Sequence, residues 1–74
     1  MSRLIRMDQT GHSTLAEWKA GDETGYREAV EAFTRELDNG YIGTVSVGPG
    51  RATHVRELPL DADLVVMRRP IAGG

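Results

Sequence analysis

A single amphipathic segment with strand-like sequence on both sides constrains the fold of this chain most. Apolar residues recur there at three- and four-residue spacing, which predicts a helix with one apolar stripe: Tyr26, Ala29, Val30, Phe33 and Leu37. Charged residues are expected to fill the opposite side: Arg27, Glu28, Glu31, Arg35 and Glu36. Asp22 or Thr24 is expected to cap the start of the helix, and Asn39-Gly40 to end it. One such helix needs a sheet to cover its stripe.

Five further segments have the composition of β-strands. The first two should pair as a hairpin around a turn at Asp8 to Gly11. The last is a short, near-continuous apolar run, which is typical of a strand that is buried on both faces or lies in the sheet centre. The predicted strands cover Ser2 to Met7, His12 to Trp18, Tyr41 to Val47, Arg51 to Leu58 and Leu64 to Met67.

This order of elements predicts an α+β fold of two layers, with a mixed sheet of four to five strands packed on one helix. A last strand beside the first and parallel to it would make the fold a β-grasp, the ubiquitin-like architecture. A split β-α-β arrangement with another strand order is the structural alternative. We expect the β-grasp domain to span residues 1–69 and residues 70–74 to form a flexible tail that ends in Gly73-Gly74.

Composition excludes several classes of function. The 74 residues include no cysteine, so the chain has neither disulfides nor a thiol nucleophile. A net charge of −2 argues against nucleic acid as the main partner. The longest apolar stretch, Leu64 to Met67, is far shorter than the roughly 20 residues of a membrane helix, and no signal peptide is recognisable. The sequence thus predicts a cytoplasmic protein without a membrane partner.

The residues that could carry chemistry do not form a catalytic pattern. His12 and His54 are isolated and have no second ligand at metal-binding spacing. Ser13 follows His12 directly, and neighbours on a strand point to opposite faces. Asp61 and Asp63 share a loop and are expected to be solvated. We therefore expect a protein that is not an enzyme and binds neither metal nor cofactor.

The segment from Leu58 to Gly74 resembles the end of ubiquitin-like sulfur carriers, most closely the small subunit of molybdopterin synthase. That family has a leucine-containing loop, an acidic turn, an apolar last strand and a proline-containing tail before the final Gly-Gly. The sequence departs from this family at two places. Ala62 stands where the family usually has glycine, and Arg68-Arg69 stand where the sulfur carriers more often have apolar residues or proline. Basic residues just before Gly-Gly are instead similar to those of ubiquitin. The chain also resembles small bacterial and phage-encoded ubiquitin-like proteins in its aspartate-rich helix entry and in its Arg-Glu-Leu before the last strand.

The resemblance implies a carrier or modifier whose reacting group is its own C-terminal carboxylate. An adenylating partner enzyme of the ubiquitin-activating type would use ATP to activate Gly74. A sulfur source, cysteine or lysine would then capture the acyl group. Gly73 would keep the tail thin enough for a narrow active site. The expected partner-binding residues are Arg68, Arg69, Pro70, Ile71 and Ala72.

A second hypothesis comes from another class of protein. The chain would be a structural module of a large protein assembly such as a phage particle, and would then be found in the virion. Its tail would serve as a docking arm that extends a partner's sheet or lies in a groove. The alternative interpretation of Arg68 and Arg69 is a solvated strand end.

Overall fold

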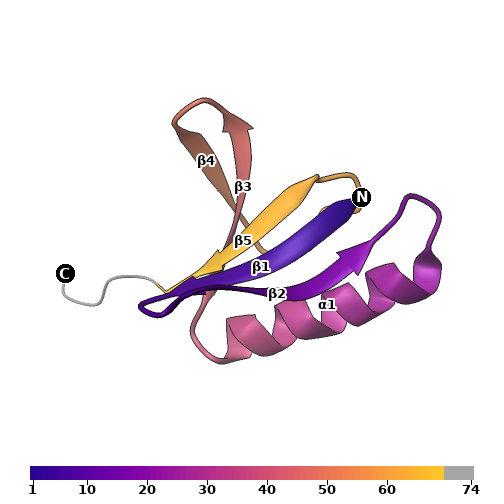
Figure 1. Ribbon diagram of the computed structural model, residues 1–74, viewed down its shortest axis with the longest axis horizontal. Helices are drawn as coiled ribbons and strands as arrows, with labels where there is room; N and C mark the ends of the chain where they lie inside the picture. The colour runs from indigo at the N-terminus through magenta and orange to yellow at the C-terminus, as the bar shows by residue number, and fades with distance from the viewer. Residues whose placement is uncertain (70–74) are drawn as a thin grey trace.

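A computed structural model describes residues 1–69, apart from the side chain of Val47. It contains five strands and one helix, drawn in Figure 1. Their order along the chain is the predicted one. The elements are β1 (Ser2–Asp8), β2 (Gly11–Trp18), α1 (Glu23–Asp38), β3 (Ile42–Gly48), β4 (Arg51–Val55) and β5 (Leu64–Arg68).

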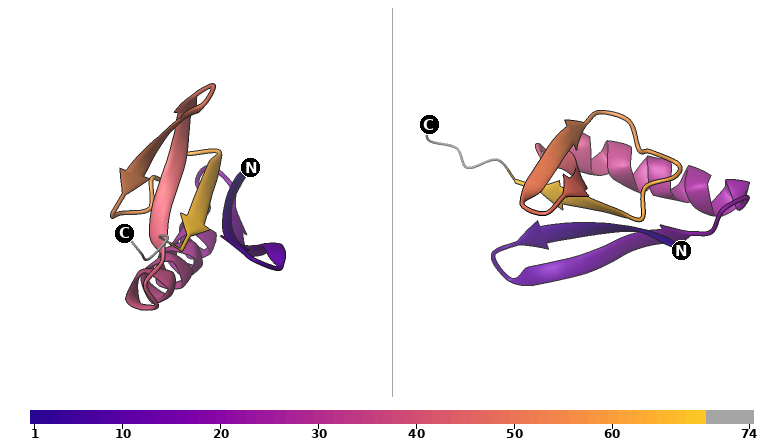
Figure 2. Two further views of the ribbon diagram at one scale, coloured as in Figure 1. Left: turned by 90° about the vertical axis from the view of Figure 1, so that its left-hand side faces the viewer. Right: turned by 90° about the horizontal axis from the view of Figure 1, so that it is seen from above.

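The five strands form one mixed sheet in the order β2-β1-β5-β3-β4. The last strand, β5, lies in the centre, parallel to β1 and antiparallel to β3. The hairpins β1–β2 and β3–β4 flank it, and α1 packs across one face of the sheet (Figures 1 and 2). The protein is thus a small α+β fold of two layers. Its strand order is compatible with the β-grasp arrangement that the sequence predicts.

The ends of α1 follow from local chemistry. The side chain of Asp22 accepts a hydrogen bond of 2.9 Å from the backbone N–H of Gly25, so Asp22 is the cap and Thr24 lies inside the helix. At the other end Asn39 closes the last turn, and Gly40 has a φ of +91°, a conformation that glycine adopts without strain.

The core lies between α1 and the sheet. Phe33 packs so closely on β3 that a Cβ at Gly43 would lie 2.6 Å from its ring. Trp18 closes the core at the end of β2, and its indole N–H donates to the carbonyl of Leu60. Among the side chains that the structure describes, the buried apolar ones are those of Leu4, Trp18, Ala29, Phe33, Leu58, Val65 and Met67.

Two sequence predictions need correction. Glu36 is buried rather than on the exposed side of the helix, because Arg6 on β1 reaches it. The strand predicted over Arg51 to Leu58 ends at Val55, and Leu58 is buried by the loop that follows. Of the two alternatives predicted for the last strand, the structure has the central position, and Leu64 on the outer face of that strand is 42% exposed.

Within residues 1–69, no helical segment has the length and hydrophobicity needed to span a membrane. The division of the chain at residue 69 stays a prediction.

Candidate functional site at the end of the last strand

The residues predicted to meet a partner enzyme follow β5. Arg68 is the final residue of that strand, and both Arg68 and Arg69 are exposed. The other predicted site residues lie outside the described residues: Pro70, Ile71, Ala72, Gly73 and Gly74. What can be built from the structure is therefore the surface around the point where β5 leaves the sheet.

The alternation of side chains along β5 fixes which face Arg68 occupies. Val65 and Met67 point toward α1 and are fully buried. Leu64, Val66 and Arg68 therefore share the opposite face, because successive side chains of a strand alternate. Arg68 pairs with Met7 on β1 and with Ile42 on β3. Its guanidinium thus belongs to the face that the helix leaves open.

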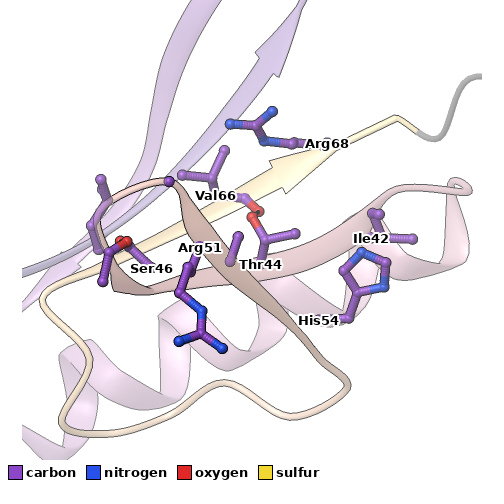
Figure 3. Close-up of a pocket in the computed structure, with 11 residues that line it drawn as sticks. Ile42, Thr44, Ser46, Arg51, His54, Val66 and Arg68 are labelled. Atoms are coloured by element: carbon purple, nitrogen blue, oxygen red, sulfur yellow. Dashed lines mark hydrogen bonds between the residues drawn. The ribbon is translucent and has the colours of Figure 1, made fainter.

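That open face is hollowed between β5 and the β3–β4 hairpin (Figure 3). The hollow has a volume of about 470 Å³, and we call it the outer-sheet groove. Its floor holds Thr44, whose hydroxyl donates a 3.0 Å hydrogen bond to the carbonyl of Val66. The residues that line the groove are Ile42, Thr44, Ser46, Gly48, Gly50, Arg51, Ala52, His54, Leu64, Val66 and Arg68.

The outer-sheet groove combines apolar and basic groups. Ile42, Leu64 and Val66 supply apolar surface, while Arg51 and Arg68 supply positive charge. None of the lining residues is acidic. A partner segment that carries carboxylates beside an apolar side chain would match this surface in charge and in polarity.

Arg69 occupies a different environment from Arg68. Its guanidinium carbon lies 5.9 Å from the centre of the Tyr41 ring, and that of Arg6 lies 5.8 Å from the same centre. Both distances are typical of cation–π contacts. The two arginines that the sequence groups as one basic pair therefore lie in different surroundings, Arg68 at the outer-sheet groove and Arg69 at Tyr41.

Arg6 joins this cluster to the buried end of α1. Its Nη1 donates to both carboxylate oxygens of Glu36 at 3.2 Å, and its Nε lies 3.9 Å from Asp8. The hydrogen bond and the charge of Glu36 raise the pKa of the Arg6 guanidinium further, so Arg6 stays charged. Its buried Nε has no hydrogen-bond partner among residues 1–69. The ion pair fixes β1 against α1 beside the point where β5 ends.

The candidate catalytic residues remain apart. His12 and Ser13 are exposed on β2, whereas His54 is exposed on β4 and lines the outer-sheet groove. Both histidines thus lie on strand surfaces, as predicted. Asp61 and Asp63 are exposed in the loop before β5. In residues 1–69, no group of three His, Cys, Asp or Glu side chains is arranged to hold a metal ion.

Sequence reasoning missed the outer-sheet groove and the cluster around Tyr41. The signal for the groove was present, since Ile42, Thr44 and Ser46 alternate with the inward residues of β3. The cluster gave no local signal, because Arg6 lies in β1, Tyr41 precedes β3 and Arg69 follows β5, and only the sheet order brings these positions together.

Comparisons of this chain with family models, with curated proteins and with solved structures found no match.

Proposed function

We propose that this protein is a ubiquitin-like carrier or modifier of the β-grasp type, whose Gly74 carboxylate is activated by an adenylating partner enzyme. The observation that carries the proposal is the position of β5. A central strand, held on both sides, runs out of the sheet at exposed Arg68 and Arg69. The sequence continues from there as Pro-Ile-Ala-Gly-Gly. A thin segment attached to a firmly held strand suits delivery into another protein's active site.

The chemistry requires nothing from this chain except its carboxylate. A carboxylate oxygen of Gly74 attacks the α-phosphorus of ATP, and the bond from that phosphorus to pyrophosphate breaks. The acyl-adenylate then loses AMP when a nucleophile attacks the carbonyl carbon. A thiol gives a thioester, an amine gives an amide, and a sulfur donor gives a thiocarboxylate. The partner enzyme supplies ATP, its metal ion and the catalytic groups.

The outer-sheet groove supports the proposal as a recognition surface. Arg68 lies at one end of the groove, so a partner seated there would contact the domain and the tail together. Basic residues such as Arg68 and Arg51 would steer an acidic partner surface toward the strand end. Contacts with the groove and with Arg68 would thus position Gly74 in the partner's active site, and the partner would need no strong contact with the glycines themselves.

The test uses the full chain, ATP and a lysate of the source organism. Intact mass spectrometry of the protein recovered from its source first establishes whether Gly74 carries the terminal carboxylate. The same measurement after incubation then detects an adenylate, thiocarboxylate or conjugate at Gly74. We expect Gly73→Trp, and a variant with one alanine added after Gly74, to remain folded and to lose every such product. Unchanged product from the extended variant would contradict the proposal.

A second function, the structural module of an assembly, is favoured by one separate observation. Among residues 1–69, strands β2 and β4 form the two edges of the sheet, and each pairs with a neighbour on one side only. Open edges of this kind can accept a strand of another protein. An assembly module would be recovered in a large complex without ATP, and the added alanine would leave that complex intact. The same two variants therefore separate the two functions.

A further inference from the structure

A second hollow lies on the helix side of the molecule, between the start of α1 and the loop that precedes β5. It has a volume of about 590 Å³, within the range of about 300–1,000 Å³ that is typical of binding clefts. We call it the helix-start groove. The residues that line it are Gly21, Asp22, Glu23, Tyr26, Arg27, Val30 and Leu60.

Leu60 is held in an exposed position at this groove. Leu60 is 58% exposed. Its backbone carbonyl nevertheless accepts a 3.1 Å hydrogen bond from the indole N–H of Trp18, which is fully buried. The hydroxyl of Tyr26 holds the same loop by donating to the carbonyl of Leu58. These two bonds hold the backbone of the loop at Leu58 and Leu60. Leu60, with half-buried Tyr26 and Val30, presents a preformed apolar surface.

The charges around the helix-start groove are mainly negative. The lining residues include two acidic ones, Asp22 and Glu23, and one basic one, Arg27. Exposed Asp61 follows Leu60 directly in the sequence. The groove thus fits a segment in which positive charge stands next to an aliphatic side chain. The outer-sheet groove has the opposite preference, because its charged lining residues are basic.

The segment Arg68-Arg69-Pro70-Ile71 has this chemistry. Two arginines precede a β-branched aliphatic residue, and Pro70 restricts its own φ and favours an extended Arg69. A segment with fewer conformations to lose pays a smaller entropic cost on docking. The arginines match the carboxylates of the groove, and Ile71 matches its apolar surface.

The segment cannot fill the groove of its own chain. Arg69 lies at Tyr41, which follows the last turn of α1, whereas the helix residues that line the groove belong to its first turns. The helix rises about 18 Å between Tyr26 and Asp38. Ile71 follows Arg69 by two residues, which extend over at most about 7 Å.

We infer that the helix-start groove binds the Arg68–Ile71 segment of a second copy of this protein. The contact joins two different surfaces, so in a dimer one copy keeps a free segment and the other keeps a free groove, and further copies add head to tail. Docking would cover the segment that the proposed activation requires, which gives the protein a concentration-dependent way to withhold it. The inference itself does not depend on adenylation.

Sedimentation velocity of the full chain, without ATP or any other protein, tests this inference. We expect the average mass to rise between micromolar and millimolar concentration. Leu60→Lys blocks the groove and Ile71→Asp blocks the segment, so each variant alone should remain monomeric. An equimolar mixture of the two should form dimers and nothing larger, because only one intact groove and one intact segment can meet.

The controls separate a lost contact from a lost fold. Glu23→Lys should weaken association, whereas Glu31→Lys, the same exchange at an exposed helix position outside the groove, should associate like the parent protein. Circular dichroism melts establish that each variant is folded. A parent protein that stays monomeric at millimolar concentration would overturn the inference. A mixture of the two blocked variants that forms no dimer, or forms large species, would overturn it as well.

Discussion

Glu36 is a charged residue on an otherwise apolar surface of the helix. It follows Phe33 by three residues and Ala29 by seven, and both of these are buried against the sheet. Residues at this spacing share one side of a helix, so Glu36 has to face β1. There Arg6 meets it with two hydrogen bonds of 3.2 Å. The partner makes burial of this carboxylate tolerable, since a buried charge without a partner is costly.

Removal of one member of this pair should cost more than removal of both. Glu36→Leu leaves the guanidinium of Arg6 beside an apolar core, so we expect a clear fall in melting temperature. Arg6→Met together with Glu36→Leu replaces the pair by apolar side chains and should recover much of the loss. Thermal unfolding of both single variants and the double variant measures the coupling. Purely additive effects would contradict the assigned contact.

Gly43 is required by the close approach of Phe33. A Cβ at this position would lie 2.6 Å from Cε1 of the ring and 3.1 Å from the carbonyl of Val55. Gly43→Ala should therefore destabilise the fold by about 1–3 kcal/mol, as overpacking does in other cores. Gly48→Ala, on the same strand with no atom within 4 Å of its added Cβ, is the matched control. Denaturant unfolding measures both, and equal stabilities would contradict this packing.

Among the elements, the β1–β2 turn depends on the charge of one carboxylate. Asp8 accepts hydrogen bonds from the hydroxyl of Thr10 at 2.6 Å and from its backbone N–H at 2.8 Å. These bonds, first the hydroxyl and then the N–H, lower the pKa of Asp8 in the folded protein. A lowered pKa means that the carboxylate stabilises the fold above its unfolded pKa of about 3.9. That contribution is lost as the pH falls through the lower, folded value.

At low pH, the fold should therefore lose the extra stability that Asp8 gives it over an asparagine at the same position. We expect Asp8→Asn to be less stable than the parent protein at pH 6, and the difference to shrink as the pH falls below about 4. Thr10→Ala, which removes one of the two donors, should show a smaller version of the same pattern. Urea unfolding over this pH range provides the measurement. A difference that does not change with pH would contradict the role of the charge.

The elements themselves could be read from the sequence, but several of their boundaries and faces could not. Periodicity and caps located α1, because spacing and a capping aspartate are local properties. The end of β4 at Val55 depends on Leu58 packing into the core outside the sheet, which no local pattern encodes. The sequence of β5 does not reveal which of its faces is buried, for a similar reason. Apolar residues occur on both faces of this strand, although α1 covers only one of them.

In the whole molecule, one layer of helix covers one face of a five-stranded sheet, and the other face holds the outer-sheet groove. If a partner docks in this groove, Arg68 and Leu64 should both contribute to binding, at opposite ends of the contact. Arg68→Glu should reduce the yield of any product at Gly74 in the lysate assay, and added salt should reduce the parent's yield in the same way.

Leu64→Ser tests the apolar part of this contact. Because Leu64 is already 42% exposed, the exchange should change stability little while it lowers the yield of product. Thr53→Ser, an exposed residue of β4 that does not line the groove, is the control. A yield that both Arg68→Glu and Leu64→Ser leave unchanged would exclude the outer-sheet groove as the docking surface.

The position of β5 also determines when this protein can fold during its synthesis. The two hairpins and the helix are translated first, and the strand that joins β1 to β3 is the last of the five to be translated. Until Leu64 to Arg68 are available, the sheet lacks its middle and Val65 and Met67 are missing from the core. Chains cut short before β5 should therefore be degraded rather than accumulate, and only a finished domain would ever display Arg68 and Arg69 at its surface.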